Sequence, residues 1–555
     1  MTTVRSLRRI YFAAAAGALA AFASSAAAQQ DPDRPKVTYT PLVQSGQQPP
    51  GFSPGRQFSM FPYHSYVGDS NHVVFLASVD APYPHYPHAD GIFINHEGQT
   101  SLIAKTGQAA PGFAPGVIIQ GFDINYHRAN RHGQVVFEST LAGPGIKDTG
   151  DDDTNAMANW IYSEGQLTRI AQFREPAAGI PGALYRNFGR TTINDHGNIA
   201  FGGDLVNGDG IGPGNDGVFW YGAPGNPQVL AREGDPLPGR PGKSIFELGG
   251  FHYPVLSSSG YVAFGARVGP FLEDAFVVGT PGNLTTVAAS GDPAPGTSTT
   301  FRNSTAGHTH IDVNNFGVMS FGVTLQDGTY ALYVGGQGQG SGHGGGGSQL
   351  RKIARSSEPA PGLPGRNFDF FFGGDLNDRG EVAFLADTQE TDASHNAVYL
   401  SKPTDPPQLI AANGQRAPGT GPGVFFGDFF SYPVLNKDGQ VAFFASLVGP
   451  NARGGEHEDY GIFATGHDGD LRLIARFGDV FDLAPGDERT IAALSDHGVH
   501  GAHVINFSDE FNLSFKMRFT DGSEAIVTAR VLPEPGLLAL AAAAIPFLAA
   551  RRRRR

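Results

Sequence analysis

Short runs of hydrophobic residues, broken by polar positions, recur along the chain and end in turns rich in Gly, Pro or Asn. One sequence motif is clearest at residues 436–443 (NKDGQVAF) and occurs in eight copies between residues 70 and 515. The copies end 57 to 72 residues apart, at Phe75, Phe137, Phe201, Phe264, Phe321, Phe384, Phe443 and Phe515. This period exceeds a solenoid rung and is typical of a four-stranded propeller blade with long loops.

Each repeat predicts four short strands, which in the seventh repeat cover residues 425–435, 440–447, 460–465 and 471–475. Asn-x-x-Gly between the first two strands suits a tight turn, in which Asn bonds its own backbone and Gly takes a positive φ. In the second strand a small residue stands between two bulky ones. We therefore expect bulky residues of one sheet to pack over small residues of the next.

Seven repeats supply all four strands, whereas the last supplies three, from about His503 to Val531. A lone strand pattern at residues 37–43 precedes the first repeat. In a ring this segment would complete the last blade and cover both free sheet edges. Independent β-sandwiches are the competing architecture, but four strands make a small core. We predict an all-β chain forming an eight-bladed β-propeller that the N-terminal strand closes.

The ends of the chain carry the patterns of processing signals. Arg5, Arg8 and Arg9 precede an apolar run, and Ala28 before Gln29 ends a small-residue cleavage pattern. Residues 1–28 therefore predict a secretory signal peptide that signal peptidase removes. The propeller domain is expected to cover residues 29–532.

Residues 533–555 combine a short motif, an apolar stretch and a basic end, namely Pro533, Glu534, Pro535, residues 536–550, and the arginines from Arg551 and Arg552 onward. This tail resembles the PEP-CTERM sorting signal of Gram-negative bacteria. The resemblance implies processing by an exosortase-type enzyme, membrane contact before processing, and display in a polysaccharide-rich cell envelope. A plain membrane anchor is the alternative, although fifteen apolar residues fall short of the roughly 20 that a spanning helix needs.

Composition and charge narrow the classes of function. The chain has no cysteine, which excludes thiol catalysis, disulfides and cysteine-ligated metals, and its 41 phenylalanines argue against disorder. Without the two ends, 31 basic residues face 51 acidic ones, a net charge of about −20. A surface this acidic repels phosphate backbones, so we expect no nucleic-acid partner, while calcium and neutral glycans stay compatible.

The NxxGxxAF phrase, the Ala-Pro-Gly turns after most fourth strands (GDPAPG at residues 291–296) and the sorting tail resemble one family. It comprises exported bacterial proteins with tandem NxxGxxAF repeats and a variable C-terminal anchor. The resemblance covers nearly the whole mature chain and implies surface display without an established activity. The first copy departs from the pattern at residues 68–71, and the last has a stretched turn after Asn506.

Candidate ligands for a metal lie in loops between the second and third strands. These oxygen-bearing side chains are Asp148, Asp151, Asp152 and Asp153 in the second repeat, and Asn207 and Asp209 in the third. Such loops could hold calcium, but neither ends in the bidentate Glu of an EF-hand, and a solvated loop is the competing interpretation. We expect no other cofactor.

The histidines are a weaker signal. His497, His500 and His503 are spaced three apart, which puts neighbours on opposite faces of a strand, and His308 and His310 lie in another repeat. Ordinary polar or turn roles are therefore expected. The Gly-rich segment at residues 335–349 reads as a flexible linker.

No convergent catalytic cluster is recognisable in the sequence, and neither Gly-x-Ser-x-Gly nor His-Glu-x-x-His occurs. The leading hypothesis is a cell-surface scaffold or binding module, with envelope polysaccharide as its partner. The alternatives are a glycan-active hydrolase or lyase and a purely structural surface-layer component.

Overall fold

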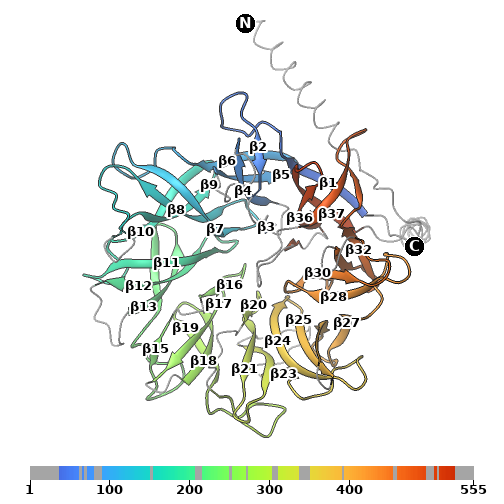
Figure 1. Cartoon of the computed structure of the whole chain (residues 1–555). Helices are drawn as coiled ribbons and strands as arrows, with labels where there is room; N and C mark the ends of the chain where they lie inside the picture. The colour runs from blue at the N-terminus through green and yellow to red at the C-terminus, as the bar shows by residue number, and fades with distance from the viewer. Residues whose placement is uncertain are drawn as a thin grey trace, which may run out of the picture.

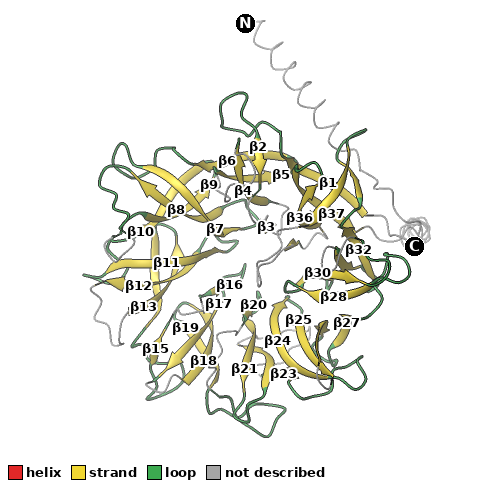
Figure 2. Cartoon of the chain, viewed as in Figure 1, coloured by secondary structure: helices red, strands yellow, loops and turns green. Residues whose placement is uncertain are grey.

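The computed structural model describes residues 37–61, 66–67, 72–80, 90–149, 154–206, 216–248, 253–269, 273–302, 310–336, 350–390, 393–453, 459–494, 506–508 and 512–531. Within these ranges the chain has 37 β-strands and no helix (Figure 2). The strands form eight antiparallel sheets set around a central axis (Figure 1). The predicted eight-bladed β-propeller is confirmed.

The first four blades follow one another along the chain. Blade one has β2 (Phe58–Met60), β3 (Tyr66–Val67), β4 (Val73–Val79), β5 (Gly91–His96) and β6 (Gln99–Lys105). Blade two has β7 (Ile118–Ala129), β8 (Val135–Ala142), β9 (Met157–Ser163) and β10 (Gln166–Gln172). Blade three has β11 (Leu184–Ile193), β12 (Ile199–Val206), β13 (Asp216–Ala223) and β14 (Asn226–Arg232). Blade four has β15 (Ile245–Glu247), β16 (Val255–Leu256), β17 (Val262–Val268), β18 (Glu273–Thr280) and β19 (Asn283–Ala289).

The other four blades complete the ring. Blade five has β20 (Ile311–Val313), β21 (Val318–Thr324), β22 (Tyr330–Gly336) and β23 (Arg351–Arg355). Blade six has β24 (Asn367–Leu376), β25 (Val382–Glu390), β26 (Ala393–Ser401) and β27 (Gln408–Ala412). Blade seven has β28 (Phe425–Phe429), β29 (Val434–Leu435), β30 (Val441–Val448), β31 (Tyr460–Thr465) and β32 (Leu471–Arg476). Blade eight has β33 (Val480–Asp482), β34 (Glu488–Leu494), β35 (Asn506–Phe507), β36 (Asn512–Phe519) and β37 (Glu524–Val531), together with β1 (Val37–Gln44).

The N-terminal strand closes the ring, as predicted. β1 pairs antiparallel with β37, from Val37 opposite Val531 to Gln44 opposite Ala525. Figure 1 shows β1, in blue, beside the red C-terminal strands. Because β1 occupies the outer position of blade eight, the described chain joins its two ends in one sheet and covers an edge that would otherwise be open.

The sequence prediction was wrong about where the last blade begins. Its first strand was expected near His503, whereas β34 already forms the inner strand at residues 488–494 and pairs with β36. The short β35 continues the same edge and pairs Phe507 with Leu513. Eleven residues of chain separate the two pieces of strand, which hid the first piece from a search for one continuous run.

The packing of large over small residues is also confirmed. All eight anchor phenylalanines of the repeat are at most 1 % exposed. The small position beside each anchor is buried too, and it packs against the neighbouring blade: Val74 lies in a cluster with Phe137, and Ala442 in one with Phe515. Burying each phenylalanine contributes roughly 1.5–3 kcal/mol.

Eight such apolar clusters follow the ring, one at each junction between blades. The cluster between blades eight and one contains Val43 of β1 and Ile526 of β37 together with Phe75. The core is therefore a closed belt of blade junctions.

The repeat asparagine performs two tasks. Its Oδ1 accepts backbone N–H groups within its own turn, as at Asn377, which receives Arg379 N and Glu381 N at 3.0 and 3.1 Å. Its amide then donates to the carbonyl of the asparagine in the next blade. Such links join Asn314 to Asn377 and Asn377 to Asn436, both at 3.1 Å. The turn role was predicted, whereas the link between blades was not.

Each blade passes to the next through a turn that begins with a left-handed residue. The φ angles lie between 68° and 92° at Gly46, Gly107, Arg174, Gly234, Gly291, Ser357, Gly414 and Gly478. The following polar side chain caps the preceding strand, as where Asp292 Oδ2 accepts Ala289 N at 2.9 Å. The Pro-Gly segment then folds back onto the next inner strand, with Pro293 bridging to Thr300. These turns therefore connect the outer strand of one blade to the inner strand of the next.

Two substitutions with opposite sign test this left-handed position. Gly414→Ala should destabilise the protein by about 1 kcal/mol, because its φ is 82° while a Cβ there meets no atom within 4 Å. Ser357→Gly relieves the same strain at φ 68° and should not destabilise. Urea unfolding measures both, with Gly225→Ala, at a φ outside the left-handed region and equally open, as the control. Equal losses in Gly414→Ala and Gly225→Ala would contradict the strain.

Candidate functional site

Most of the site residues expected from sequence lie outside the described residues. Asp148 is described and is exposed in the loop between β8 and β9. The remaining predicted calcium ligands, the histidines 308, 497, 500 and 503, and the whole sorting tail fall outside the described ranges. Among the residues that are described, no group of three or more His, Asp or Glu could hold a metal, and no helix is long and apolar enough to cross a membrane.

The inner strands provide a different candidate, because each is interrupted where it approaches the axis. The pairing of β11 with β12 shifts between Gly189 and Thr192, and that of β24 with β25 shifts between Phe372 and Asp375. In blades one, four, seven and eight the inner strand is split into two pieces. Figure 1 shows the short pieces β3 and β16, and the short β20, nearest the centre of the ring.

Two positions in these interruptions vary strongly between blades, although the turns beside them repeat. Four residues before the repeat Asn or Ser stand Arg190, Tyr253, His310, Gly373 and Tyr432, in blades three to seven. Two residues before it stand Thr192, Val255, Asp312, Asp375 and Val434. Residues two apart on a strand share a face. We call Arg190, Tyr253, His310, Asp312, Asp375 and Tyr432 the axial cluster.

Glycines make room for the two tyrosines of this cluster. A Cβ on Gly373 would lie 2.8 Å from the ring of Tyr432, and one on Gly189 would lie 3.3 Å from the ring of Tyr253. Each tyrosine therefore covers the inner strand of the preceding blade. The Tyr432 ring lies 5.7 Å from that of His310, edge to face, and the Arg190 guanidinium lies 5.4 Å from the centre of the Tyr253 ring.

The two carboxyl groups link three successive blades through hydrogen bonds to backbone N–H groups. Asp312 Oδ2 accepts Leu376 N of the next blade at 2.8 Å, and Asp375 Oδ2 accepts Leu435 N of the blade after that at 2.6 Å. The two carboxyl groups also hydrogen-bond to each other. Burial raises the pKa of both, and with the charge of Asp312 it raises that of Asp375 to about 8. The pair therefore retains a proton at neutral pH.

His310 is held in its neutral form. Its Nδ1 accepts Gly374 N at 3.2 Å, which leaves the ring proton on Nε2. Burial lowers the pKa of His310, and the charge of Arg190 lowers it further against the opposing effect of Asp312. As whole residues, His310, Asp312 and Asp375 are half-buried. The axial cluster thus combines the exposed Arg190 with the half-buried His310, Asp312 and Asp375.

The axial cluster can recognise a polar ligand with apolar faces. Arg190 is exposed and carries a fork of N–H donors, His310 carries a ring N–H on Nε2, and the two tyrosines contribute aromatic rings. The carboxyl pair is unlike that of a glycosidase, where the two groups stand about 5–9.5 Å apart on either side of the scissile bond. Here they bond to each other and to backbone N–H groups.

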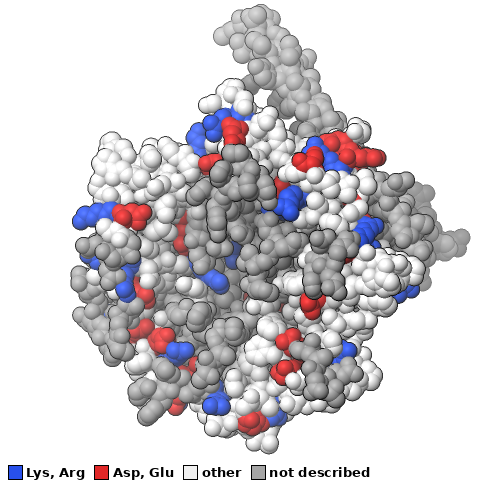
Figure 3. Space-filling model, viewed as in Figure 1, with Lys and Arg blue, Asp and Glu red and all other residues white. Residues whose placement is uncertain are grey.

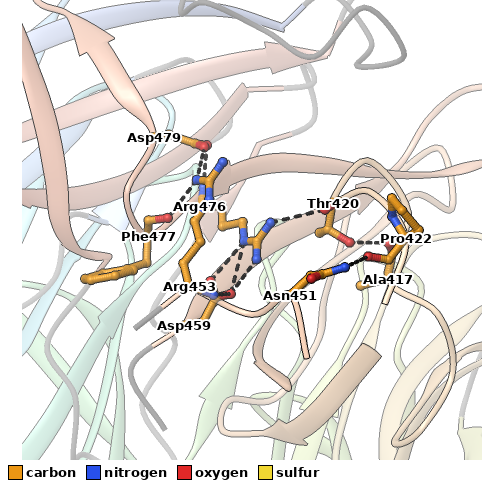
Figure 4. A network of polar contacts seen from close by, with 9 residues as sticks. All are labelled: Ala417, Thr420, Pro422, Asn451, Arg453, Asp459, Arg476, Phe477 and Asp479. Carbon is orange, nitrogen blue, oxygen red and sulfur yellow. Dashed lines mark hydrogen bonds and ion pairs between the residues drawn. The ribbon is translucent and has the colours of Figure 1, made fainter. Parts of the chain in front are cut away.

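A second polar cluster, in the outer strands of blade seven, is structural (Figure 4). Arg476 Nε donates to Asp459 Oδ1 at 2.9 Å, and these side chains are 3 % and 0 % exposed. Arg453 bonds the same carboxylate through its backbone N at 2.7 Å and pairs with Asp479 at 2.6 Å. Each charged group in this network has a partner of opposite charge, so the network holds Arg453 and Asp459 against the end of β32 and the turn after it.

A cavity at the rim is a second candidate. A cavity of about 610 Å³ lies between β23 and residues 403–407, with Arg351, Lys352, Glu358 and Asp405 among its lining. The two charge signs balance there, and Lys352 is paired with Glu358. Figure 3 likewise shows basic and acidic side chains in small mixed groups on this face, with no continuous patch of one sign among the described residues.

The fold and the axial cluster define the class: an eight-bladed β-propeller in which a repeated scaffold carries one non-repeating group of polar side chains. The chain belongs to the family of unknown function DUF7453, whose profile matches residues 17–153 and 151–539.

No curated protein matches the chain. Among solved structures, it is similar to the polysaccharide lyase Uly1 at 10% identity and TM-score 0.37, covering 77% of this chain and 94% of that one. The WD40 domain of SCAP from fission yeast is similar at 7% identity and TM-score 0.38, covering 92% of this chain and 98% of that one. The Aleuria aurantia lectin is similar at 11% identity and TM-score 0.23, covering 63% of this chain and 94% of that one. Identities and scores this low carry no argument about function.

The sequence search missed the axial cluster because its members come from five different repeats. Only His310 had been noted, and it was assigned an ordinary role. Aligning the repeats on their Asn or Ser and comparing the positions two and four residues earlier would have exposed the variation. The ring then brings these single residues together.

Removing one partner of the buried ion pair in blade seven should destabilise the protein strongly. Asp459→Asn leaves Arg476 buried without its countercharge, and the expected loss is about 3–5 kcal/mol. Thermal and urea unfolding measure it, with Asp470→Asn, an exposed carboxylate on the same blade, as the matched control. A loss below about 1 kcal/mol would contradict the structural role.

The axial carboxyl pair predicts that stability falls as pH rises. The pKa of Asp375 is raised from 3.8 to about 8, so the folded protein holds a proton that the unfolded chain releases. This stabilisation is complete below about pH 4 and is lost as pH rises through about 8, with a slope of about 1.4 kcal/mol per pH unit between those limits.

Asp375→Asn should remove most of that slope, whereas Asp405→Asn at the exposed rim should leave it unchanged. Urea unfolding at intervals between about pH 5 and pH 9 gives the comparison. Identical pH profiles for the wild type and Asp375→Asn would show that the pair does not share a proton.

Proposed function

We propose that this chain is an exported, cell-surface propeller that binds saccharide chains of the envelope through the axial cluster. The observation that carries the proposal is a pair of aromatic contacts at the inner-strand interruptions, where Tyr253 lies 5.4 Å from the Arg190 guanidinium and Tyr432 lies 5.7 Å from the His310 ring. Sugars present apolar ring faces and many hydroxyl groups. Aromatic faces flanked by fixed donors suit that chemistry.

The sequence supports the cellular setting of this proposal. The expected signal peptide at residues 1–28 and the tail at residues 533–555 would bring the protein to a polysaccharide-rich envelope. Signal peptidase and an exosortase-type enzyme would be its processing partners. The net charge of the whole chain is −13. An acidic surface repels anionic ligands and is compatible with neutral sugars.

Affinity electrophoresis through gels that contain xylan or polygalacturonate tests the proposal. We expect at least one polymer to retard the purified protein, and Tyr253→Ala or Tyr432→Ala to weaken retardation about tenfold, because aromatic contacts contribute about 0.5–1.5 kcal/mol beyond area burial. Melting curves confirm that each variant is folded.

Phe316→Ala is the matched control, since Phe316 is 54 % exposed on the turn of blade five. Loss of retardation in Phe316→Ala but in neither tyrosine variant would move the binding surface to the turns. The absence of retardation in every gel would favour a purely structural component. Shortening of the polymer during incubation would instead show the hydrolase or lyase alternative.

A further inference from the structure

We infer that the cavity at the rim, between blades five and six, is a second ligand site. It takes a small apolar molecule with one carboxylate, and Arg351 binds that carboxylate. The cavity holds about 610 Å³, within the roughly 300–1,000 Å³ of ordinary small-molecule sites. The inference goes beyond the proposed saccharide binding, since none of the residues that line the cavity belongs to the axial cluster.

Arg351 supplies the charge of this site. Its side chain reaches from β23 in blade five to blade six, where Nη1 donates to Ser401 Oγ at 3.2 Å. This is the one hydrogen bond of the Arg351 guanidinium within the described part of the chain, and no described carboxylate forms an ion pair with it. The rest of its planar fork of N–H donors remains for a ligand.

The burial of Arg351 makes a negatively charged ligand favourable. Burial lowers the pKa of Arg351, and no carboxylate among the described residues opposes this effect. The guanidinium still keeps its positive charge at neutral pH. Because a half-buried cation without a countercharge is costly, a carboxylate that pairs with it gains more than it would at an exposed arginine.

The other charges in the lining do not replace the missing partner. Lys352 is paired with Glu358, and Asp405 is exposed to solvent. One carboxylate on the ligand would therefore neutralise Arg351. A polymer with many negative charges is disfavoured, because the chain as a whole carries a net charge of −13 and repels the further charges.

The walls of the cavity select an apolar molecule. Eight of the thirteen lining residues are apolar, and five of these are prolines. In the turn between the blades, Pro359 bridges to Asn367, and Pro361 O accepts the Tyr399 hydroxyl at 3.0 Å. Because proline fixes its own φ, these walls are formed before the ligand arrives and cost little ordering on binding. Sugar hydroxyl groups against such walls would lose hydrogen bonds to water.

Isothermal titration calorimetry with benzoate and with benzamide, which has a similar shape but no charge, tests the inference. The wild type should bind benzoate about tenfold more tightly, as expected for a hydrogen bond between charged groups. Arg351→Gln should remove this preference, while Arg351→Lys, which keeps the charge but loses the planar fork, should keep part of it. Galacturonate, a polar acid, should bind about tenfold more weakly than benzoate, because its hydroxyl groups face apolar walls.

Arg416→Gln is the control, because Arg416 is an exposed arginine in the turn after β27 and does not line the cavity. Melting curves show that each variant is folded. The comparison of benzoate with benzamide on the wild type depends on no variant, so equal affinity for the two, or binding of neither, would overturn the inference.

Three further results would also overturn it. These are a benzoate preference that survives Arg351→Gln, galacturonate bound as tightly as benzoate, and loss of benzoate binding in Tyr432→Ala of the axial cluster. Retardation of the protein by polysaccharide gels should be the same in Arg351→Gln as in the wild type. The saccharide proposal and the rim site can therefore fail separately.

Discussion

The structure depends on closure of the ring. Every blade must meet its neighbours through the same surface, because eight junctions of equal geometry have to complete one full turn. Each junction therefore repeats a large residue over a small one, such as Phe515 against Ala442, and the asparagine links fix the turns to one another. The N-terminal strand meets the last requirement by pairing β1 with β37, so that no blade is left with an unfilled position.

Closure also determines where the sequence is free to vary. The turns and second strands are bound into the junctions, whereas the interruptions of the inner strands lie nearer the axis, where Val255 and Val434 join apolar junction clusters and polar residues stand at the matching positions of other blades. Non-repeating residues such as Arg190 and His310 can occupy them without disturbing the ring. Asp312 and Asp375 combine both roles, since their ladder to Leu376 and Leu435 ties three blades together and also sets the charge beside the axis. The fully paired Arg476 and Asp459 show what a purely structural ion pair looks like in the same fold.

The sequence was informative wherever a feature repeats. Eight copies of one phrase predict the blades, the glycine turns and the closing strand, because a period seen many times outweighs a poor copy such as residues 68–71. The prediction of the last inner strand was wrong, because this strand is split into two pieces that end at Leu494 and begin again at Asn506. It was silent about the axial cluster and the asparagine links, because both depend on partners about sixty residues away. A short pattern within one repeat cannot reveal a contact that only the ring creates.

Hydrogen–deuterium exchange of the intact protein, with and without a saturating polygalacturonate oligomer, tests most directly the claim that the axial cluster is the binding site. We predict that exchange slows at the inner-strand amides around Arg190, His310, Asp375 and Tyr432, and stays unchanged at the repeat turns and the rim. Protection confined to the turns or to the cavity beside Arg351, with none along the inner strands, would contradict the claim.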